Sequence, residues 1–194
     1  MVAALIVPGS NIIIENVGIN PTRAGLFEVL QNMGGDIQFK KQRTVGGEPV
    51  ADIHVKHSPL TGIDIPANIA PSMIDEFPIL FVAAALASGE TTTRGLHELR
   101  VKESDRLSQM AKGLELLGVK LTEKDDGLLI EGSGGKPLAG GQAGPVIETA
   151  LDHRIAMSFA VAGLVTKSGL SIDDIRPVET SFPGFDDLMT KLVA

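Results

Sequence analysis

The chain has 194 residues, 43% of them hydrophobic, which indicates a folded globular protein with one sizeable core or two small ones. Its formal net charge of -7 provides no overall positive field for nucleic acid or an anionic membrane, so any anion site must be local. The absence of cysteine excludes disulfides and thiolate metal sites, and we expect a soluble cytoplasmic protein. The apolar residues 1–7 that open the chain are too few to span a bilayer.

Three segments of the chain resemble one another, and each contains a glycine at the equivalent position. Gly9, Gly89 and Gly169 recur at an interval of about 80 residues. In each segment we expect a helix of small apolar residues that ends at the glycine and is followed by a short strand. A loop then leads into an amphipathic helix.

Two amphipathic helices are expected from apolar residues spaced i, i+3, i+4 and i+7, which places them on one helix face. The first stripe consists of Leu26, Val29, Leu30 and Met33. The second consists of Leu107, Met110, Ala111 and Leu114. A glycine follows each helix, Gly34 and Gly118, as expected of a C-terminal cap.

Alternating apolar and polar residues after each amphipathic helix predict a pair of strands joined by a turn. Residues 36–42 would pair with 51–57, and residues 119–124 with 127–132. Each unit thus contains a strand, a helix, two strands and a further helix. The first unit lacks the beginning of its leading helix and the third lacks its final strands, so we infer a piece of a longer repetitive protein whose functional site is only partly present.

Residues 100–107, RVKESDRL, form a charged stretch just before the second amphipathic helix. The second unit is longer than the first at this point, and insertions between matched elements tend to lie on functional loops. We expect Ser104 to cap the helix, which places Asp105 and Arg106 in its first turn. A cation there costs about 0.3–1 kcal/mol unless an anion lies nearby. The alternative is a surface ion pair of Arg106 with Glu103 or Asp105.

A second cation is expected at a helix start in LDHRIAMSF, where Asp152 would cap the helix and Arg154 would lie in its first turn. The helix is rich in small apolar residues, so Arg154 should lie at the edge of the core. Two arginines at helix starts in equivalent parts of a repeat indicate a common anion site that suits phosphate or carboxylate.

The equivalent helix of the preceding unit begins in MIDEFPILFVAAA, with Asp75 in the place of Arg154. Asp75 can be a helix cap. It can equally be a carboxylate near cations that accepts a proton from a substrate hydroxyl, and the two roles are compatible. The four histidines match no metal-ligand pattern.

These motifs together, RVKESDRL, LDHRIAMSF, MIDEFPILFVAAA and NPTRAGL, closely resemble the C-terminal domain of the 5-enolpyruvylshikimate-3-phosphate (EPSP) synthase family. The resemblance covers essentially the whole chain in the right order. It implies an α/β fold of repeated βαβαββ units in a pseudo-threefold arrangement, with buried helices and outer sheets. Residues 1–194 would then be a single C-terminal domain of a two-domain enzyme with truncated first and last units, and the N-terminal domain would be absent from this chain.

The resemblance also implies an activity in the shikimate pathway to chorismate and the aromatic amino acids. The enolpyruvyl group of phosphoenolpyruvate is transferred to the 5-hydroxyl of shikimate 3-phosphate and phosphate is released, without metal or cofactor. Asp75 would accept the hydroxyl proton and contact shikimate 3-phosphate, and Lys102 would bind that substrate too. Arg106 and Arg154 would hold phosphoenolpyruvate, and Glu103 would help to protonate its methylene carbon. A monomer is expected, and this chain alone should be nearly inactive because other substrate residues lie on the N-terminal domain.

Two alternatives remain open from the sequence. A related enolpyruvyl transferase that acts on UDP-N-acetylglucosamine would share the fold and the reaction, but that family usually uses a reactive cysteine and lacks RVKESDRL. A non-catalytic anion-binding module would use the same cations as structural ion pairs. Phosphate binding without activity after addition of the missing domain would favour the module.

Overall fold

The architecture repeats along the chain as the glycine spacing predicts, in a computed structural model that describes residues 1–139 and 144–193. The α-helices are α1 Val2–Ile6, α2 Gly25–Asn32, α3 Phe77–Leu86, α4 Arg106–Leu116, α5 His153–Gly163, α6 Arg176–Ser181 and α7 Phe185–Val193. The strands are β1 Asn11–Gly18, β2 Asp36–Val45, β3 Glu48–Lys56, β4 Glu90–Thr92, β5 Lys120–Lys124, β6 Gly127–Glu131, β7 Val146–Ile147 and β8 Ser171–Ile172. Short 3₁₀ turns lie at Pro21–Arg23, Ala67–Ser72, Ile74–Glu76 and His97–Val101.

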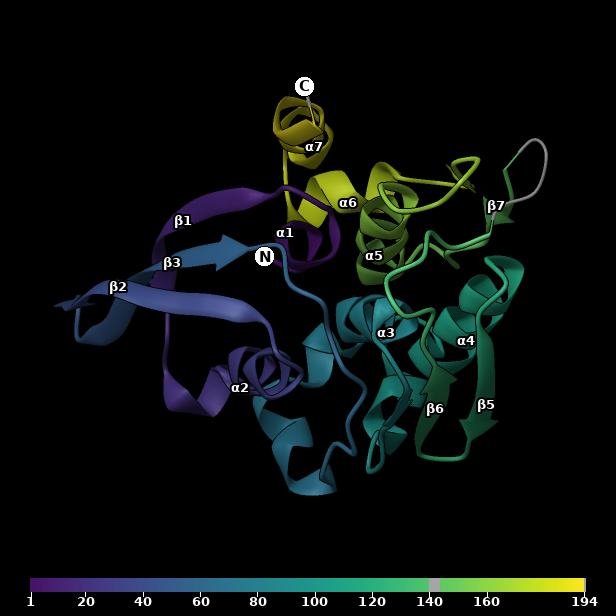
Figure 1. Ribbon diagram of the computed structural model, residues 1–194, viewed down its shortest axis with the longest axis horizontal. Coiled ribbons are helices and arrows are strands. Elements are labelled where there is room, and N and C mark those ends of the chain that lie inside the picture. Colours follow the sequence, from purple (N-terminus) through teal and green to yellow (C-terminus); the bar gives the residue numbers. More distant parts are fainter. Residues whose placement is uncertain (140–143, 194) are drawn as a thin grey trace.

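The leading helices of the three units, α1, α3 and α5, lie at the centre and contact one another. Figure 1 shows the β1, β2 and β3 sheet on one side of α3 and strands β5 and β6 on the other. Helix α3 is apolar on every side, and its residues are buried except Ile79, which is half-buried. A helix without a polar face must be surrounded by protein, so the prediction of buried helices and outer sheets is confirmed.

The two complete sheets have the same topology, with strand orders β1-β3-β2 and β4-β6-β5 and antiparallel neighbours. Thr61 and Asp64, which precede α3, form parallel bridges to Ser88 and Thr92. Residues 61–131 therefore trace one full βαβαββ unit. In the third unit the described strands are a parallel pair, β7 with β8.

The glycines of the repeat are explained by backbone conformation. Gly9, Gly89 and Gly169 have φ angles of 81°, 86° and 71°. Residues with a side chain adopt this left-handed conformation only at a cost in free energy, whereas glycine adopts it readily. Gly34 and Gly118, with φ angles of 94° and 77°, end the amphipathic helices in the same way, which confirms the predicted caps.

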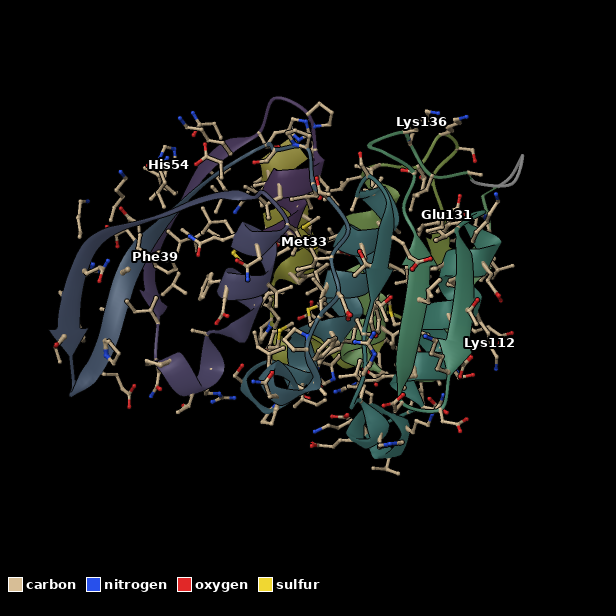
Figure 2. The ribbon with its side chains drawn as sticks, turned by 60° about the horizontal axis from the view of Figure 1, so that its bottom comes forward. Met33, Phe39, His54, Lys112, Glu131 and Lys136 are labelled. Atoms are coloured by element: carbon tan, nitrogen blue, oxygen red, sulfur yellow. The ribbon has the colours of Figure 1, made fainter. Side chains whose placement is uncertain are left out.

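The predicted apolar stripes face the interior. Val29, Leu30 and Met33 are buried, as is the whole second stripe from Leu107 to Leu114, whereas Leu26 is partly buried. Figure 2 shows Met33 among the helices and Lys112 at the periphery. Helix α2 packs on the sheet that contains β2, and α4 packs on the sheet that contains β5. The packing of α4 sets the position of the loop that precedes it.

Helices α4 and α5 approach closely because α4 has a glycine at the contact. A Cβ atom on Gly113 would lie 2.2 Å from Cζ of Phe159, which is fully buried in α5. A contact that short forces the side chain or the helix to move. Gly113 therefore permits the spacing between the two helices that carry Arg106 and Arg154.

We predict that Gly113→Ala lowers the free energy of unfolding by about 1–3 kcal/mol, because the added methyl group overpacks the contact with Phe159. At an exposed helix position the same change would raise the free energy of unfolding by about 1 kcal/mol, so the sign of the change in stability shows whether Gly113 is tightly packed. Urea denaturation followed by circular dichroism measures it. Lys112→Ala, an exposed change in the neighbouring position, should alter stability by less than about 0.5 kcal/mol. A stabilised Gly113→Ala protein would contradict the close contact.

Candidate active site

The residues that the sequence singles out come together where the starts of three helices meet. Asp75 lies in the Ile74–Glu76 turn before α3, and Arg106 is the first residue of α4. Lys102 and Glu103 lie in the loop between the His97–Val101 turn and α4, and Arg154 lies in the first turn of α5. Each of the three helices leads the chain away from the cluster, so its positive end points towards it.

Arg106 is the centre of this cluster and is almost completely buried, with 1% of its side chain exposed. Its Nε donates to Oδ2 of Asp152 at 2.8 Å, and its Nη1 donates to Oδ1 of Asp75 at 3.0 Å. Its Nη2 donates to Oε2 of Glu103. The alternative of a surface ion pair is right about the partner Glu103 but wrong about the surface, because Arg106 is buried. Asp75 and Asp152, which lie far from Arg106 in the sequence, also compensate its charge inside the protein.

Asp152 caps α5 as predicted, since its Oδ1 accepts from the backbone N–H groups of Arg154 and Ile155 at 2.9 and 3.4 Å. Its Oδ2 accepts from Arg106 and from the hydroxyl of Ser104, and its side chain is fully buried. Burial pushes the pKa of Asp152 upwards, but the hydrogen bond and charge of Arg106 outweigh it and hold that pKa below its ordinary value. Sequence reasoning found the cap and missed the pairing with Arg106.

The cap of α4 differs from the prediction. Asp105, and not Ser104, is the capping residue, and its carboxylate accepts from the backbone N–H of Ser108 at 3.0 Å. Arg100 pairs with Asp105 at 2.9 Å. The Ser104 hydroxyl is directed to Asp152 instead, so a tertiary hydrogen bond replaces the local one.

Asp75 is not the cap of α3. Glu76 occupies that position without a side-chain capping bond, because the Ile74–Glu76 turn continues directly into the helix. The Asp75 carboxylate faces cations, with Nζ of Lys102 at 3.5 Å as well as Arg106. Lys102 is also paired with Glu98, which raises the pKa of the lysine. Glu98 is a member of the cluster that the sequence did not reveal, although it lies one helical turn before Lys102.

Arg154 has the more accessible guanidinium of the two arginines, with 34% of its side chain exposed. Its Nη1 donates to the backbone carbonyl of Asp75 at 2.9 Å and lies 3.6 Å from a carboxylate oxygen of Glu76. A cavity of about 200 Å³ adjoins it. The cavity is lined by Asp75, Glu76, Ile79, Arg154, Met157, Ser158, Val161 and Phe185.

Comparison with known proteins shows the family of the chain. Residues 1–189 match the family model described as EPSP synthase (3-phosphoshikimate 1-carboxyvinyltransferase). The chain belongs to the EPSP synthase family. It is 62% identical over 196 residues to a 3-phosphoshikimate 1-carboxyvinyltransferase of Zymomonas mobilis, and 62% identical over 192 residues to one of Sphingopyxis alaskensis. The alignments cover 100% and 99% of this chain but only 43% and 42% of those relatives.

Solved structures agree with this membership. EPSP synthase from Acinetobacter baumannii superposes with a TM-score of 0.94 at 48% identity, covering 98% of this chain and 43% of that one. The enolpyruvyl transferase NikO from Streptomyces tendae superposes at 0.72 with 21% identity, covering 98% of this chain and 40% of that one, which shows a shared fold. The resemblance to EPSP synthases and the predicted fold class are confirmed, and the names of the close relatives do not favour the nucleotide-sugar alternative.

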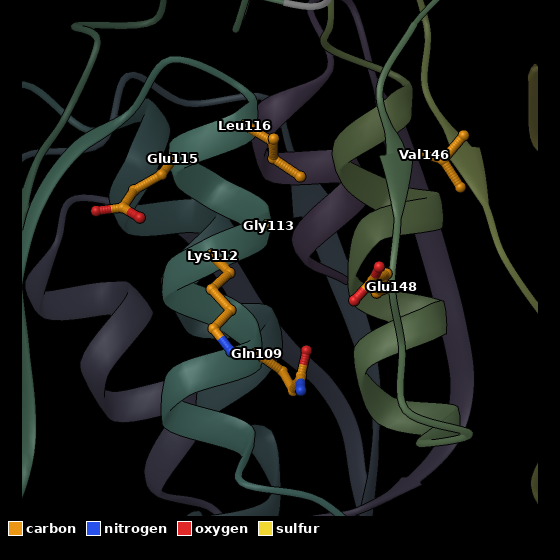
Figure 3. A pocket seen from close by; sticks show the side chains of 7 residues that line it. All are labelled: Gln109, Lys112, Gly113, Glu115, Leu116, Val146 and Glu148. Carbon is orange, nitrogen blue, oxygen red and sulfur yellow. The ribbon is translucent and has the colours of Figure 1, made fainter.

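A second hollow in this EPSP synthase family member lies away from the cluster. It has a volume of about 450 Å³, lies between α4 and β7, and is lined by Gln109, Lys112, Gly113, Glu115, Leu116, Val146 and Glu148 (Figure 3). None of the predicted site residues lines it, and its one lysine is accompanied by two glutamates. The cluster at the helix starts is therefore the better candidate for an anion site.

Within residues 1–139 and 144–193, no group of three or more His, Asp or Glu side chains is arranged to hold a metal ion. In the same ranges no helix has both the length and the apolar character needed to cross a membrane.

The pKa of Asp75 reflects the positive charges around it. Partial burial pushes the pKa of Asp75 up, but the positive charges of Arg154, Lys102 and Arg106 outweigh burial and hold it below its ordinary value of 3.8. Ionised Asp75 therefore stabilises the folded state at pH values above its unfolded-state pKa. That stabilisation is lost as the pH falls through the lower folded-state pKa.

We predict that Lys102→Met raises the pKa of Asp75, because one of the three surrounding positive charges is removed. Titration of the Asp75 carboxyl carbon by ¹³C NMR measures it. Lys112→Met, a lysine of α4 that makes no contact with the cluster, is the matched control and should leave the titration unchanged. Equal pKa values in the parent and Lys102→Met proteins would contradict the electrostatic description.

Proposed function

We propose that this chain is the C-terminal domain of an EPSP synthase, which acts with an N-terminal domain to transfer the enolpyruvyl group of phosphoenolpyruvate to the 5-hydroxyl of shikimate 3-phosphate. The observation that carries the proposal is the Asp75 carboxylate, which pairs with Lys102 and Arg106 and also feels the positive charge of Arg154, where the starts of three helices meet. Family membership and the names of the close relatives support the same reaction. A cytoplasmic, monomeric protein remains our prediction.

The cations suit the substrates, which both carry several negative charges. Arg154 and Lys102 are partly exposed and can reach anionic groups directly. Arg106 is covered by Glu103, whose side chain is 53% exposed and thus free to rotate towards solvent. We expect phosphoenolpyruvate to replace the Glu103 carboxylate on Nη2 of Arg106, so that one anion takes the place of another.

The carboxylates have distinct roles in the proposed reaction. Glu103, once released from Arg106 and protonated, delivers a proton to the methylene carbon of phosphoenolpyruvate and leaves a cationic centre. The 5-hydroxyl attacks this centre and its proton passes to Asp75, which gives a tetrahedral intermediate. Loss of phosphate, together with return of a proton from the methyl group to the Glu103 carboxylate, then forms the enolpyruvyl product. Lys102 binds shikimate 3-phosphate next to Asp75 and orients its hydroxyl.

The low pKa of Asp75 has a consequence for this proposal. Surrounded by three cations, the carboxylate is a weak base. Bound polyanions neutralise those cations, so substrate binding should make Asp75 a stronger proton acceptor. The base strength of Asp75 would then be greatest when both substrates are in place.

Transfer can be tested in a chimera in which this chain replaces the matching segment of the Zymomonas mobilis relative. We predict enolpyruvyl transfer, measured as phosphate release that requires both substrates. Asp75→Asn should lower kcat by roughly 10²–10⁴-fold, because a general base contributes about that much. Asp64→Asn, which removes an exposed carboxylate paired with Arg94 outside the cluster, is the matched control and should retain activity.

The results of these assays distinguish an enolpyruvyl transferase from a non-catalytic anion-binding module. A folded chimera that binds phosphoenolpyruvate without transfer would support the anion-binding module instead. Equal activity in the Asp75→Asn and Asp64→Asn chimeras would remove Asp75 from the chemistry while leaving the reaction intact.

A further inference from the structure

The two oxygens of Asp152 make their shorter hydrogen bonds with different parts of the candidate site, and a longer one of 3.5 Å joins Oδ1 to Nη2 of Arg106. Oδ1 accepts from the backbone N–H groups that begin α5, including that of Arg154. Oδ2 accepts from Nε of Arg106 at 2.8 Å and from the hydroxyl of Ser104 at 3.0 Å. One carboxylate thereby joins the start of α5 to the first residue of α4, which lies 46 residues earlier in the chain.

A capping role accounts for only half of these contacts. Oδ1 alone satisfies the free N–H groups at the start of α5. The contact with Arg106 adds a buried ion pair, and such pairs are often no more stabilising than apolar side chains of similar volume. Stability alone therefore does not explain why a guanidinium and a carboxylate stand here in place of apolar side chains, whereas the need to hold two cations at a set separation does.

We propose that Asp152 is a positioning residue that fixes Arg106 and Arg154 relative to one another, so that both can bind the same small anion. This inference rests on the function proposed above and deepens it, since the anion is phosphoenolpyruvate in that reaction. The geometry gives each arginine a separate constraint. Arg106 is held through its Nε, with a longer contact of 3.5 Å from Nη2 to Oδ1, while the shorter hydrogen bonds of Nη1 and Nη2 go to Asp75 and Glu103. Arg154 is held through the backbone from which its side chain extends.

The neighbouring helix offers a matched control. Asp105 caps α4 through the N–H of Ser108, as Asp152 caps α5, but its second partner is Arg100, which lies outside the site. Asp152→Asn retains an oxygen for the cap and places an amide opposite Nε of Arg106, where two donors cannot bond. Asp105→Asn weakens a cap without contacting either site arginine.

The chimera described above tests the inference. In Asp152→Asn we expect the KM for phosphoenolpyruvate to rise about tenfold or more, with a much smaller change in the KM for shikimate 3-phosphate. Asp105→Asn should leave both values near those of the parent even where its melting temperature falls equally. In an Arg106→Lys background, Asp152→Asn should add little further effect, because the guanidinium that it positions is gone. Equal rises in both KM values, or parity with Asp105→Asn, would overturn the positioning role.

A milder variant covers the case in which Asp152→Asn does not fold. Ser104→Ala removes one donor from Oδ2 and leaves the cap of α5 intact, so it should raise the KM for phosphoenolpyruvate by a smaller factor in the same direction. An unchanged KM in Ser104→Ala would count against the inference.

Binding to this chain distinguishes failure of the inference from failure of the proposed function. Should the parent chimera be inactive, titration with phosphoenolpyruvate is followed through the ¹⁵N–¹H signal of Arg106 Nε and the amide signal of Arg154. The inference requires both signals to shift with one dissociation constant in the parent chain, and that constant to be larger in Ser104→Ala. Independent shifts with two constants would overturn it.

Discussion

The buried guanidinium of Arg106 is the interaction on which the rest of the site depends. A charge inside a protein costs several kcal/mol unless it is paired and hydrogen-bonded, and Arg106 satisfies this with carboxylates from three other places in the chain. Asp75 precedes α3, Glu103 precedes α4 and Asp152 precedes α5. Burial of one cation thus requires the starts of helices from different repeat units to converge.

The same pairing bears on how an acidic protein could hold the proposed anion site. The net charge of -7 repels anions overall, and within the cluster each cation has at least one carboxylate partner. In the proposed function an anion would therefore enter by exchange with a carboxylate such as Glu103. Exchange favours ligands with several negative charges in a compact arrangement, because they can replace the lost pairings at more than one cation.

Packing behind the site sets its dimensions. Helices α4 and α5 carry the two arginines, and the absence of a side chain at Gly113 lets Phe159 lie directly against α4. Asp152 connects the same two helices at their first turns. The contact of Gly113 with Phe159 is apolar and lies along the length of the helices. The contacts of Asp152 are polar and lie at the helix starts, and both sets of contacts together fix the separation of the two arginines.

The sequence by itself determined the features that depend on near neighbours. Left-handed glycines, apolar stripes and the Asp152 cap are local, so spacing revealed the repeat and the helix starts, and the motifs identified the family. The predicted capping roles of Ser104 and Asp75 are wrong. The Ser104 hydroxyl donates to Asp152, and the turn before α3 puts Glu76 at the cap while the Asp75 carboxylate pairs with Arg106. Only the fold decided that Arg106 is buried and shares Asp152 with the start of α5. These contacts join residues 31 to 48 positions apart, a separation at which no sequence pattern specifies which polar groups will meet.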